Sequence, residues 1–474
     1  MGKLIEDRTP ALSISLRLKK LHMKKATVIG LGRSGIAAAK LLIKHGYIVT
    51  LSDCNNNPSL ETQKQELETF GINVKLGDKF THTTEDLIVV SPGIPWDILP
   101  LVKARETGID TIGEMELAWR YLQDIPWVAI TGTNGKTTTT ALTDAIFKAA
   151  GLDTTACGNI GFAACELALL ETKPAWIIAE LSSYQIESAF TLKPQIGVWT
   201  TLTPDHLARH KTVENYAAIK AKLLHNSQHK IFNGDDRYLH DLGDSDWQDV
   251  TWTSIKGQKY LQGNPESGVW IEDNWVMFRS ERVLQADSLK MPGDHNLQNL
   301  LMAVGIAKLA GIKNSSIASA VASFPGVAHR LEYICTDEGV DYINDSKATN
   351  YDAADVGLSA VKAPTILIAG GAAKEGDDLA WLNTIKQKAA AVLLIGDAGT
   401  QFADRLRSVG YTNFEIVETM VNAVSRSSQL AQKYQAKVVL LSPACASFDQ
   451  YDSFEQRGDD FRQLCQNLQQ EVRE

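Results

Sequence analysis

Short apolar runs rich in β-branched residues alternate along this chain with segments whose apolar residues recur at helical spacing, from Ala26 almost to the C-terminus. Strands that alternate with helices in this way are typical of α/β units built on parallel sheets. Ligands of such sheets gather beyond the carboxyl ends of the strands, so the loops that follow strands are the places to look for chemistry.

The alternation divides into three blocks, which predicts an α/β protein with three domains. Residues 23–113 are predicted as a Rossmann-like domain, 114–325 as a central P-loop ATPase-like domain with a parallel sheet, and 326–474 as a second Rossmann-like domain. Residues 1–22 fit no block and are predicted as a disordered tail, or as an upstream start with Met23 as the functional one.

Individual elements follow from the same pattern. Between Trp247 and Gln285, tryptophan, glycine and polar residues replace the helical period, which predicts an antiparallel β appendage. Helices are expected at 114–121 and 138–149. Strands are expected at 26–30, 48–52, 87–90, 127–131, 176–181, 196–200, 364–370, 391–396 and 437–442.

Composition narrows the class of protein. The chain has 474 residues, of which 44% are hydrophobic and 22% charged, as in globular proteins, and its net charge of −9 argues against general binding to nucleic acids. Six cysteines without CxxC pairing fit a reducing cytoplasm, and no apolar run approaches the roughly 18 residues of a membrane span. We therefore expect a cytoplasmic protein, a monomer, that acts on small molecules.

The strongest chemical signal is the sequence TGTNGKTT, which runs from Thr131 to Thr138 between a predicted strand and a predicted helix. Glycines let backbone N–H groups approach phosphate oxygens, Lys136 can reach the outer phosphates, and Thr137 can hold magnesium. Ile130 stands where the common phosphate loop has its first glycine. The segment predicts a nucleoside triphosphate site formed by Gly132, Thr133, Asn134, Gly135, Lys136, Thr137 and Thr138.

This loop resembles the variant phosphate loop of the Mur ligase family, which includes the folylpolyglutamate synthetases. Later segments agree with that family in their order along the chain: Gly158-Asn159-Ile160-Gly161, Glu180 to Gln185, and Asp205-His206. The resemblance extends from Ala26 to about Gly458. It implies an ATP-dependent enzyme that joins a carboxylate to an amine, with ATP and Mg²⁺ as cofactors.

Glu180 lies at the end of one predicted strand and His206 follows another, so both are expected near Lys136 at the carboxyl edge of the sheet. The resemblance implies that Thr137, Glu180 and His206 hold the metal, together with a lysine carbamylated by carbon dioxide. The family pattern of tyrosine, three residues and lysine matches Tyr216 and Lys220, with Lys222 as the alternative. A fixed anion there would help to neutralise the cations of the site.

The first block carries a second glycine motif. Gly30-Leu31-Gly32-Arg33-Ser34-Gly35 satisfies GxGxxG after a strand, and Asp53 lies where a dinucleotide site has its acidic residue. Read alone, it predicts an NAD(P)-dependent oxidoreductase. The motif requires only close approach to a diphosphate, which a UDP-sugar also has. The resemblance assigns a UDP-linked substrate to Gly32, Arg33, Ser34, Gly35, Asp53, Gly93, Asn159 and His206, although Asp53-Cys54-Asn55 replaces the family's Asp-Thr-Arg.

The third block resembles the branch of the family that adds D-glutamate, because it carries the sequences around Asn344 to Asn350 and Leu441 to Gln450 and lacks Asp-Asn-Pro-Arg. By this resemblance, D-glutamate contacts Thr349, Lys374, Ser447 and Phe454. Asn296, Asn299, Arg330 and Asp345 complete the ATP site, and Lys347 faces a phosphate or acyl phosphate. An interdomain ion pair of Arg330 with Asp345, and a solvated Lys374, are the alternatives.

The resemblance thus implies that D-glutamate is added to UDP-N-acetylmuramoyl-L-alanine through an acyl phosphate, as a step of peptidoglycan precursor synthesis. The catalytic candidates are Lys136, His206, Lys220 and Lys347, with His206 as the candidate general base. Three alternatives stay open: a folylpolyglutamate synthetase-like ligase, the oxidoreductase, and a nucleotide-binding module without catalysis.

Overall fold

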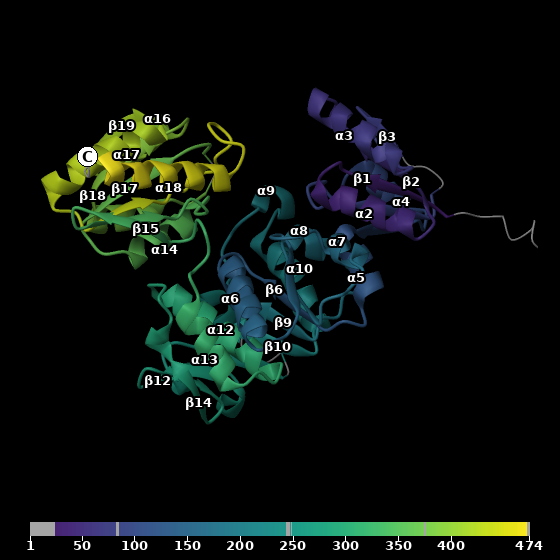
Figure 1. Cartoon of the computed structure of the whole chain (residues 1–474), viewed down its shortest axis with the longest axis horizontal. Helices are drawn as coiled ribbons and strands as arrows, with labels where there is room; N and C mark the ends of the chain where they lie inside the picture. Colours follow the sequence, from purple (N-terminus) through teal and green to yellow (C-terminus); the bar gives the residue numbers. More distant parts are fainter. Residues whose placement is uncertain (1–23, 82–84, 243–246, 248, 374–375, 472–474) are drawn as a thin grey trace, which may run out of the picture. The chain divides into compact units, whose positions relative to one another are not determined.

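The computed structural model describes residues 24–81, 85–242, 247, 249–373 and 376–471 (Figure 1). The chain forms two compact units. The first comprises the chain up to Ala129 with Thr155–Gln195 and His206–Gln228, and the second comprises Ile130–Thr154, Ile196–Asp205 and the chain from His229 onward. Within the described ranges, the helices include none that is both long and apolar enough to cross a bilayer.

The N-terminal sheet has five parallel strands in the order β3-β2-β1-β4-β5, with helices packed around it (Figure 1). The strand order reverses at β1, which lies between β2 and β4, so the loops after β1 and β4 flank a topological switch point. The elements are β1 (Lys25–Ile29), α2 (Arg33–Lys44), β2 (Ile48–Asp53), α3 (Pro58–Thr69), β3 (Asn73–Leu76), β4 (Leu87–Val90), α4 (Leu99–Glu106) and β5 (Asp110–Gly113).

The central sheet has nine strands in the order β14-β13-β12-β11-β10-β9-β6-β8-β7. Its strands are β6 (Trp127–Thr131), β7 (Thr154–Gly158), β8 (Trp176–Glu180), β9 (Ile196–Trp199), β10 (His229–Asn233), β11 (Val250–Ser254), β12 (Val269–Glu272), β13 (Trp275–Phe278) and β14 (Glu281–Gln285). Its helices are α5 (Glu114–Leu122), α6 (Lys136–Ala149), α7 (Ala164–Leu169), α8 (Ser183–Glu187), α9 (Leu207–His210), α10 (Val213–Asn226), α11 (Arg237–Leu242), α12 (Asp294–Leu309) and α13 (Asn314–Ser323).

The predicted antiparallel appendage is wrong in its first part. β11 pairs in parallel with both β10 and β12, and only the β12-β13-β14 meander is antiparallel. All five residues of β11 are buried, as is usual for a strand covered on both faces. The antiparallel extension of the sheet therefore begins at β12.

The C-terminal sheet has six strands in the order β15-β16-β20-β17-β18-β19, and only β15 runs antiparallel. Alternate residues of the central strands pack into two cores, against α14, α15 and α16 on one face and against α17 and α18 on the other. The elements are β15 (Glu332–Asp337), β16 (Val340–Asn344), α14 (Tyr351–Ala360), β17 (Thr365–Gly370), α15 (Leu379–Lys388), β18 (Ala389–Ile395), α16 (Gly399–Ser408), β19 (Phe414–Glu418), α17 (Met420–Tyr434), β20 (Val438–Leu441) and α18 (Phe454–Glu471). The predicted fold class, mixed α/β with parallel sheets in all three regions, is confirmed.

Candidate active site

The phosphate loop joins β6 to α6 and is braced by the segment that follows β9. The Thr133 N–H donates to the carbonyl of Thr201 at 2.9 Å, and the Asn134 N–H donates to the Thr201 hydroxyl at 2.9 Å. The Thr200 N–H donates to the Thr131 carbonyl at 2.9 Å. The protein's own hydrogen bonds therefore set the shape of the loop.

Two glycines of the loop stand where a side chain does not fit. A Cβ on Gly132, whose φ is +149°, would lie 1.9 Å from the Thr200 hydroxyl oxygen. A Cβ on Gly135, whose φ is +84°, would lie 2.6 Å from Oδ1 of Asn299. Both positions thus need glycine, for space and for backbone conformation.

Substituting Gly135 tests the importance of the loop's shape. We expect Gly135→Ala to lower kcat/KM for ATP by about 100-fold, because the added methyl displaces loop atoms by a distance on the order of 1 Å. Gly151→Ala is the matched control: Gly151 follows the other end of α6 at φ +79°, and its Cβ would meet open space. That control should cost about 1 kcal/mol of stability and leave kcat/KM unchanged. Equal losses in the two variants would contradict the prediction.

Three cationic side chains of the second unit converge on this loop. Nζ of Lys136 lies 2.9 and 2.8 Å from two loop carbonyl oxygens, those of Gly132 and Thr133. The Thr137 hydroxyl accepts hydrogen bonds from Nη2 of Arg330 at 3.3 Å and from Nζ of Lys347 at 2.9 Å. The residues predicted to meet phosphates are therefore together in the structure.

The predicted nucleotide residues also line one pocket of about 260 Å³. Those that reach it are Asn134, Gly135, Thr138, Asn296, Asn299, Arg330 and Asp345. Sequence reasoning missed other lining residues, among them Thr201, Asp236, Met291, His295 and Val356. Thr201 directly follows a predicted strand and His295 adjoins Asn296, so position alone offered a signal for these two.

Burial sets the charge of two groups in this pocket. It raises the pKa of the Asp345 carboxyl to about 7, against the opposing effects of a 2.9 Å hydrogen bond from Ser442 and the charge of Arg330. Burial, reinforced by Arg330, lowers the pKa of His295 to about 4, so that this imidazole is neutral at pH 7. Arg330 lines the pocket together with four aspartates, Asp236, Asp345, Asp352 and Asp355. The other cations that suit a polyanionic ligand, Lys136 and Lys347, lie at the phosphate loop.

Glu180 is the predicted metal ligand whose surroundings fit a cation best. Its carboxylate is buried, and Oε1 accepts a hydrogen bond from Nδ2 of Asn159 at 2.7 Å. In the described part of the chain, Oε2 has no hydrogen-bond partner. A buried carboxylate oxygen without a donor suits a hard cation such as Mg²⁺. The described residues include no cluster of three or more His, Cys, Asp or Glu side chains arranged to hold a metal.

His206 and Lys220 lie around one aromatic cluster of the first unit. The His206 ring is 5.1 Å from the Tyr184 ring and 6.5 Å from the Tyr216 ring. Nζ of Lys220 lies 4.5 Å from the centre of the Tyr216 ring, and the residue is 1% exposed. Because Thr137 belongs to the second unit, a metal site that combines it with these residues stays a prediction.

Lys222, the alternative carbamate position, has different surroundings. Its Nζ donates to the carbonyls of Ile186 and Glu187, both at 3.3 Å, at the end of α8. Burial lowers the pKa of this amine. Lys222 therefore fastens α10 to α8 with its own amine, a role that a carbamate would remove.

The glycine loop of the N-terminal domain is organised around Asp53. Its carboxylate accepts the Leu31 N–H at 2.8 Å and the Asn55 N–H at 2.8 Å. A Cβ on Gly35 would lie 1.9 Å from the Gly30 carbonyl oxygen, so this glycine permits close packing of α2 against β1. Of the predicted UDP contacts, Gly32, Arg33 and Gly93 are exposed and Ser34 is half-buried.

The predicted D-glutamate residues lie on two loops and a helix start of the C-terminal domain. The Thr349 N–H donates to the carbonyl of Lys347 at 2.9 Å, and Nζ of Lys347 lies 5.1 Å from the centre of the Phe454 ring. Ser447 is buried on the loop after β20. Thr349 and Phe454 are thus brought together around Lys347, whereas Lys374 lies outside the described residues.

A phosphate loop between a strand and a helix, with three cationic side chains at the loop and a pocket beside it, defines a nucleotide-dependent class of α/β enzyme. Three family models match the chain: the Mur ligase MurD-like N-terminal domain at residues 24–113, the Mur ligase middle domain at 130–307, and the Mur ligase glutamate ligase domain at 329–445. The chain belongs to the Mur ligase family.

Similar proteins agree over nearly the full length. The chain is 62% identical to the UDP-N-acetylmuramoylalanine–D-glutamate ligase of Trichormus variabilis, over 94% of this chain and 99% of that protein. It is also 62% identical to the enzyme of the same name from Gloeothece citriformis, over 94% and 100%. The crystal structure of the UDP-N-acetylmuramate-alanine ligase of Thermotoga maritima, 20% identical, shares the fold with a TM-score of 0.58 over 94% of this chain and 100% of that one.

Proposed function

We propose that this protein uses ATP to join D-glutamate to UDP-N-acetylmuramoyl-L-alanine, a step of peptidoglycan precursor synthesis. The observation that carries the proposal is the convergence of Lys136, Arg330 and Lys347 on the phosphate loop. The names of relatives at 62% identity support the choice of substrates. The proposal includes the cytoplasm as location and a monomer as the working unit.

A carboxylate must be activated before an amine attacks it, and ATP provides the activation. A carboxylate oxygen of the alanine attacks the γ-phosphorus, the bond to ADP breaks, and an acyl phosphate forms. Lys136 leaves the loop carbonyls to bind phosphate oxygens, and Lys347 approaches the transferred group. The D-glutamate nitrogen then attacks the acyl carbon, phosphate leaves, and a proton leaves the nitrogen, with His206 as the proposed base.

Magnesium is part of the proposal, because its charge would neutralise the triphosphate as the phosphoryl group transfers. Thr137, Glu180, His206 and a carbamate on Lys220 are the proposed ligands, and the unsatisfied Oε2 of Glu180 supports that choice. UDP is assigned to the glycine loop with Asp53. The N-terminal match to a Mur ligase domain removes the reason to prefer NAD(P) there.

The choice of amino acid and acceptor is tested by ADP release with UDP-N-acetylmuramoyl-L-alanine. We expect kcat/KM with D-glutamate to exceed that with L-glutamate by at least about 100-fold, because inverting the chiral carbon misplaces the amine or leaves a carboxylate unpaired. L-Lysine and a folate acceptor serve as controls and should give only background. Equal turnover with L-glutamate would contradict the assigned amino acid, and turnover of folate with L-glutamate would favour the folylpolyglutamate alternative.

A further inference from the structure

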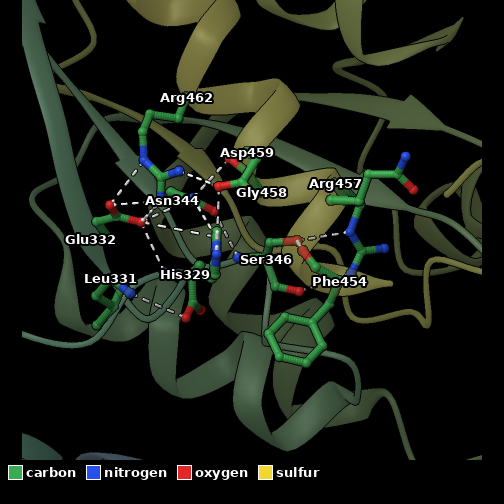
Figure 2. A network of polar contacts seen from close by, with 12 residues as sticks. His329, Leu331, Glu332, Asn344, Ser346, Phe454, Arg457, Gly458, Asp459 and Arg462 are labelled. Carbon is green, nitrogen blue, oxygen red and sulfur yellow. Dashed lines mark hydrogen bonds and ion pairs between the residues drawn. The ribbon is translucent and has the colours of Figure 1, made fainter. Parts of the chain in front are cut away.

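A polar cluster, buried at His329 and Asn344 and partly exposed at Glu332 and Arg462, lies behind the two cations that reach the phosphate loop from the C-terminal domain. We define the cluster as His329, Glu332, Asn344 and Arg462 (Figure 2). His329 precedes Arg330, Glu332 begins β15, Asn344 ends β16 three residues before Lys347, and Arg462 comes from α18. None of the four is among the predicted ligand-binding residues.

The segment that carries Arg330 has an unfavourable backbone. His329 and Leu331 flank Arg330 with φ values of +62° and +42°, a left-handed conformation that residues other than glycine rarely adopt. Glu332 stabilises the backbone at His329, because its Oε2 accepts the His329 N–H at 2.8 Å. Oδ1 of Asp345 accepts the Leu331 N–H at 3.3 Å. Carboxylates on both sides therefore fix the direction in which Arg330 leaves the chain.

Asn344 links this segment to the turn that carries Lys347. Nδ2 of Asn344 lies 3.2 Å from Oε2 of Glu332 and 3.1 Å from Nδ1 of His329, and its Oδ1 accepts the Ser346 N–H at 3.1 Å. Burial lowers the pKa of His329, which favours the neutral form of its ring. The Lys347 N–H donates directly to the His329 carbonyl at 3.1 Å. The two cation-bearing segments thus form one hydrogen-bonded body.

Arg462 anchors that body to the helix behind it. Its Nη2 lies 2.8 Å from both carboxylate oxygens of Glu332, and its Nε lies 3.1 Å from Oε1. The same guanidinium pairs with Asp459, and Asn344 also reaches the Gly458 carbonyl at 3.1 Å. In Figure 2, dashed lines join the guanidinium of Arg462 to the carboxylate of Glu332.

We propose that Glu332, Asn344 and Arg462 are positioning residues for phosphoryl transfer: they hold the backbone from which Arg330 and Lys347 reach the phosphate loop. The proposal rests on the proposed function. The three residues act through the two cations, so their loss is felt at the nucleotide and leaves the UDP-linked substrate's affinity intact.

The test compares Arg462→Gln, Glu332→Gln and Arg462→Lys in the full-length protein. Misplacing the two cations by about 1 Å should lower kcat in Arg462→Gln by about 10- to 100-fold, with the KM for UDP-N-acetylmuramoyl-L-alanine unchanged. Arg462→Lys keeps a positive charge beside Glu332 and should recover most of the loss. Glu332→Gln keeps an acceptor for the His329 N–H, so a smaller loss of kcat is expected. If Arg462→Gln does not fold, the kcat of Glu332→Gln tests the positioning role in its place.

Arg426→Gln is the matched control. Arg426 makes the same two-pronged pair with Glu415, at 2.7 and 2.8 Å, between α17 and β19 of the same sheet. The Arg426→Gln variant should lower the melting temperature about as much as Arg462→Gln does and leave kcat unchanged. A wild-type kcat in Arg462→Gln, or an equal loss in Arg426→Gln, would overturn the positioning role.

A second measurement separates this inference from the proposed function. The affinity of each variant for a nonhydrolysable ATP analogue with Mg²⁺, measured by calorimetry, needs no muramoyl substrate. Weaker binding in Arg462→Gln than in Arg426→Gln would support the positioning role even if the wild-type protein did not turn over the proposed substrates. Such a wild-type failure would count against the proposed function alone.

Discussion

Replacing Lys136 by alanine is expected to lower the kcat for ADP release by about 1,000-fold or more, because a preorganised cation opposite the transferring phosphoryl group contributes at least that much in phosphate-loop enzymes. In the structure this ammonium already lies inside the loop, bonded to the Gly132 and Thr133 carbonyls. It therefore needs only a short movement to reach bound phosphates. Steady-state kinetics with ATP, D-glutamate and the muramoyl substrate measure the effect.

Lys148→Ala provides the comparison for that variant. Lys148 stands on the same helix, α6, and pairs with Asp144 at 2.7 Å with most of its side chain in solvent. Its loss should change stability by no more than about 0.5 kcal/mol and leave kcat unchanged. A Lys136→Ala enzyme with the wild-type rate would remove the phosphate loop from the mechanism.

The predicted strands that agree with the structure are mostly buried, apolar runs. The predicted ranges for β1, β2, β4, β6, β8, β9, β17, β18 and β20 agree with the structure to within two residues at each end. β3 and β5 were not predicted, although β4, β9 and β20 are equally short, because both stand at an edge of their sheet and begin with an exposed polar residue, Asn73 or Asp110. Such a segment lacks the continuous apolar run that marks a buried strand.

Strand direction was the feature that pattern alone did not give. β11 has the sequence VTWTS, which suits a buried strand in either orientation. Its parallel pairing with β10 depends on the helix α11 between them, which returns the chain to the same edge of the sheet. Composition suggested a meander over the whole region, whereas only the last three strands form one.

The candidate site also has a part that the sequence predicts and a part that it does not. Gly132 to Thr138 were predictable because a single contiguous segment contains the whole cradle and its glycines. Thr201, Asp236 and His295 reach the pocket from three separate segments, and the polar cluster behind Arg330 depends on α18, more than 100 residues further along the chain. Such contacts arise from tertiary packing, which local periodicity does not encode.

Replacing Lys220 by alanine is expected to lower kcat by about 100-fold or more, because the proposed carbamate supplies a fixed anion beside the metal and the triphosphate. The residue is 1% exposed, so its removal leaves a small space next to Tyr216. A short carboxylate such as acetate or formate can occupy that space and replace the lost anion. We therefore expect activity to return as the concentration of added carboxylate rises, measured by ADP release at constant ionic strength.

Lys222→Ala separates the two candidate lysines. Because the Lys222 amine fastens α10 to the carbonyls of Ile186 and Glu187, its loss should lower stability by about 1 kcal/mol while kcat stays near that of the wild type and does not respond to carboxylates. Rescue of Lys222→Ala in place of Lys220→Ala would move the carbamate to Lys222. Full activity of Lys220→Ala without any added carboxylate would rule out a required carbamate at Lys220, because alanine cannot carry the negative charge.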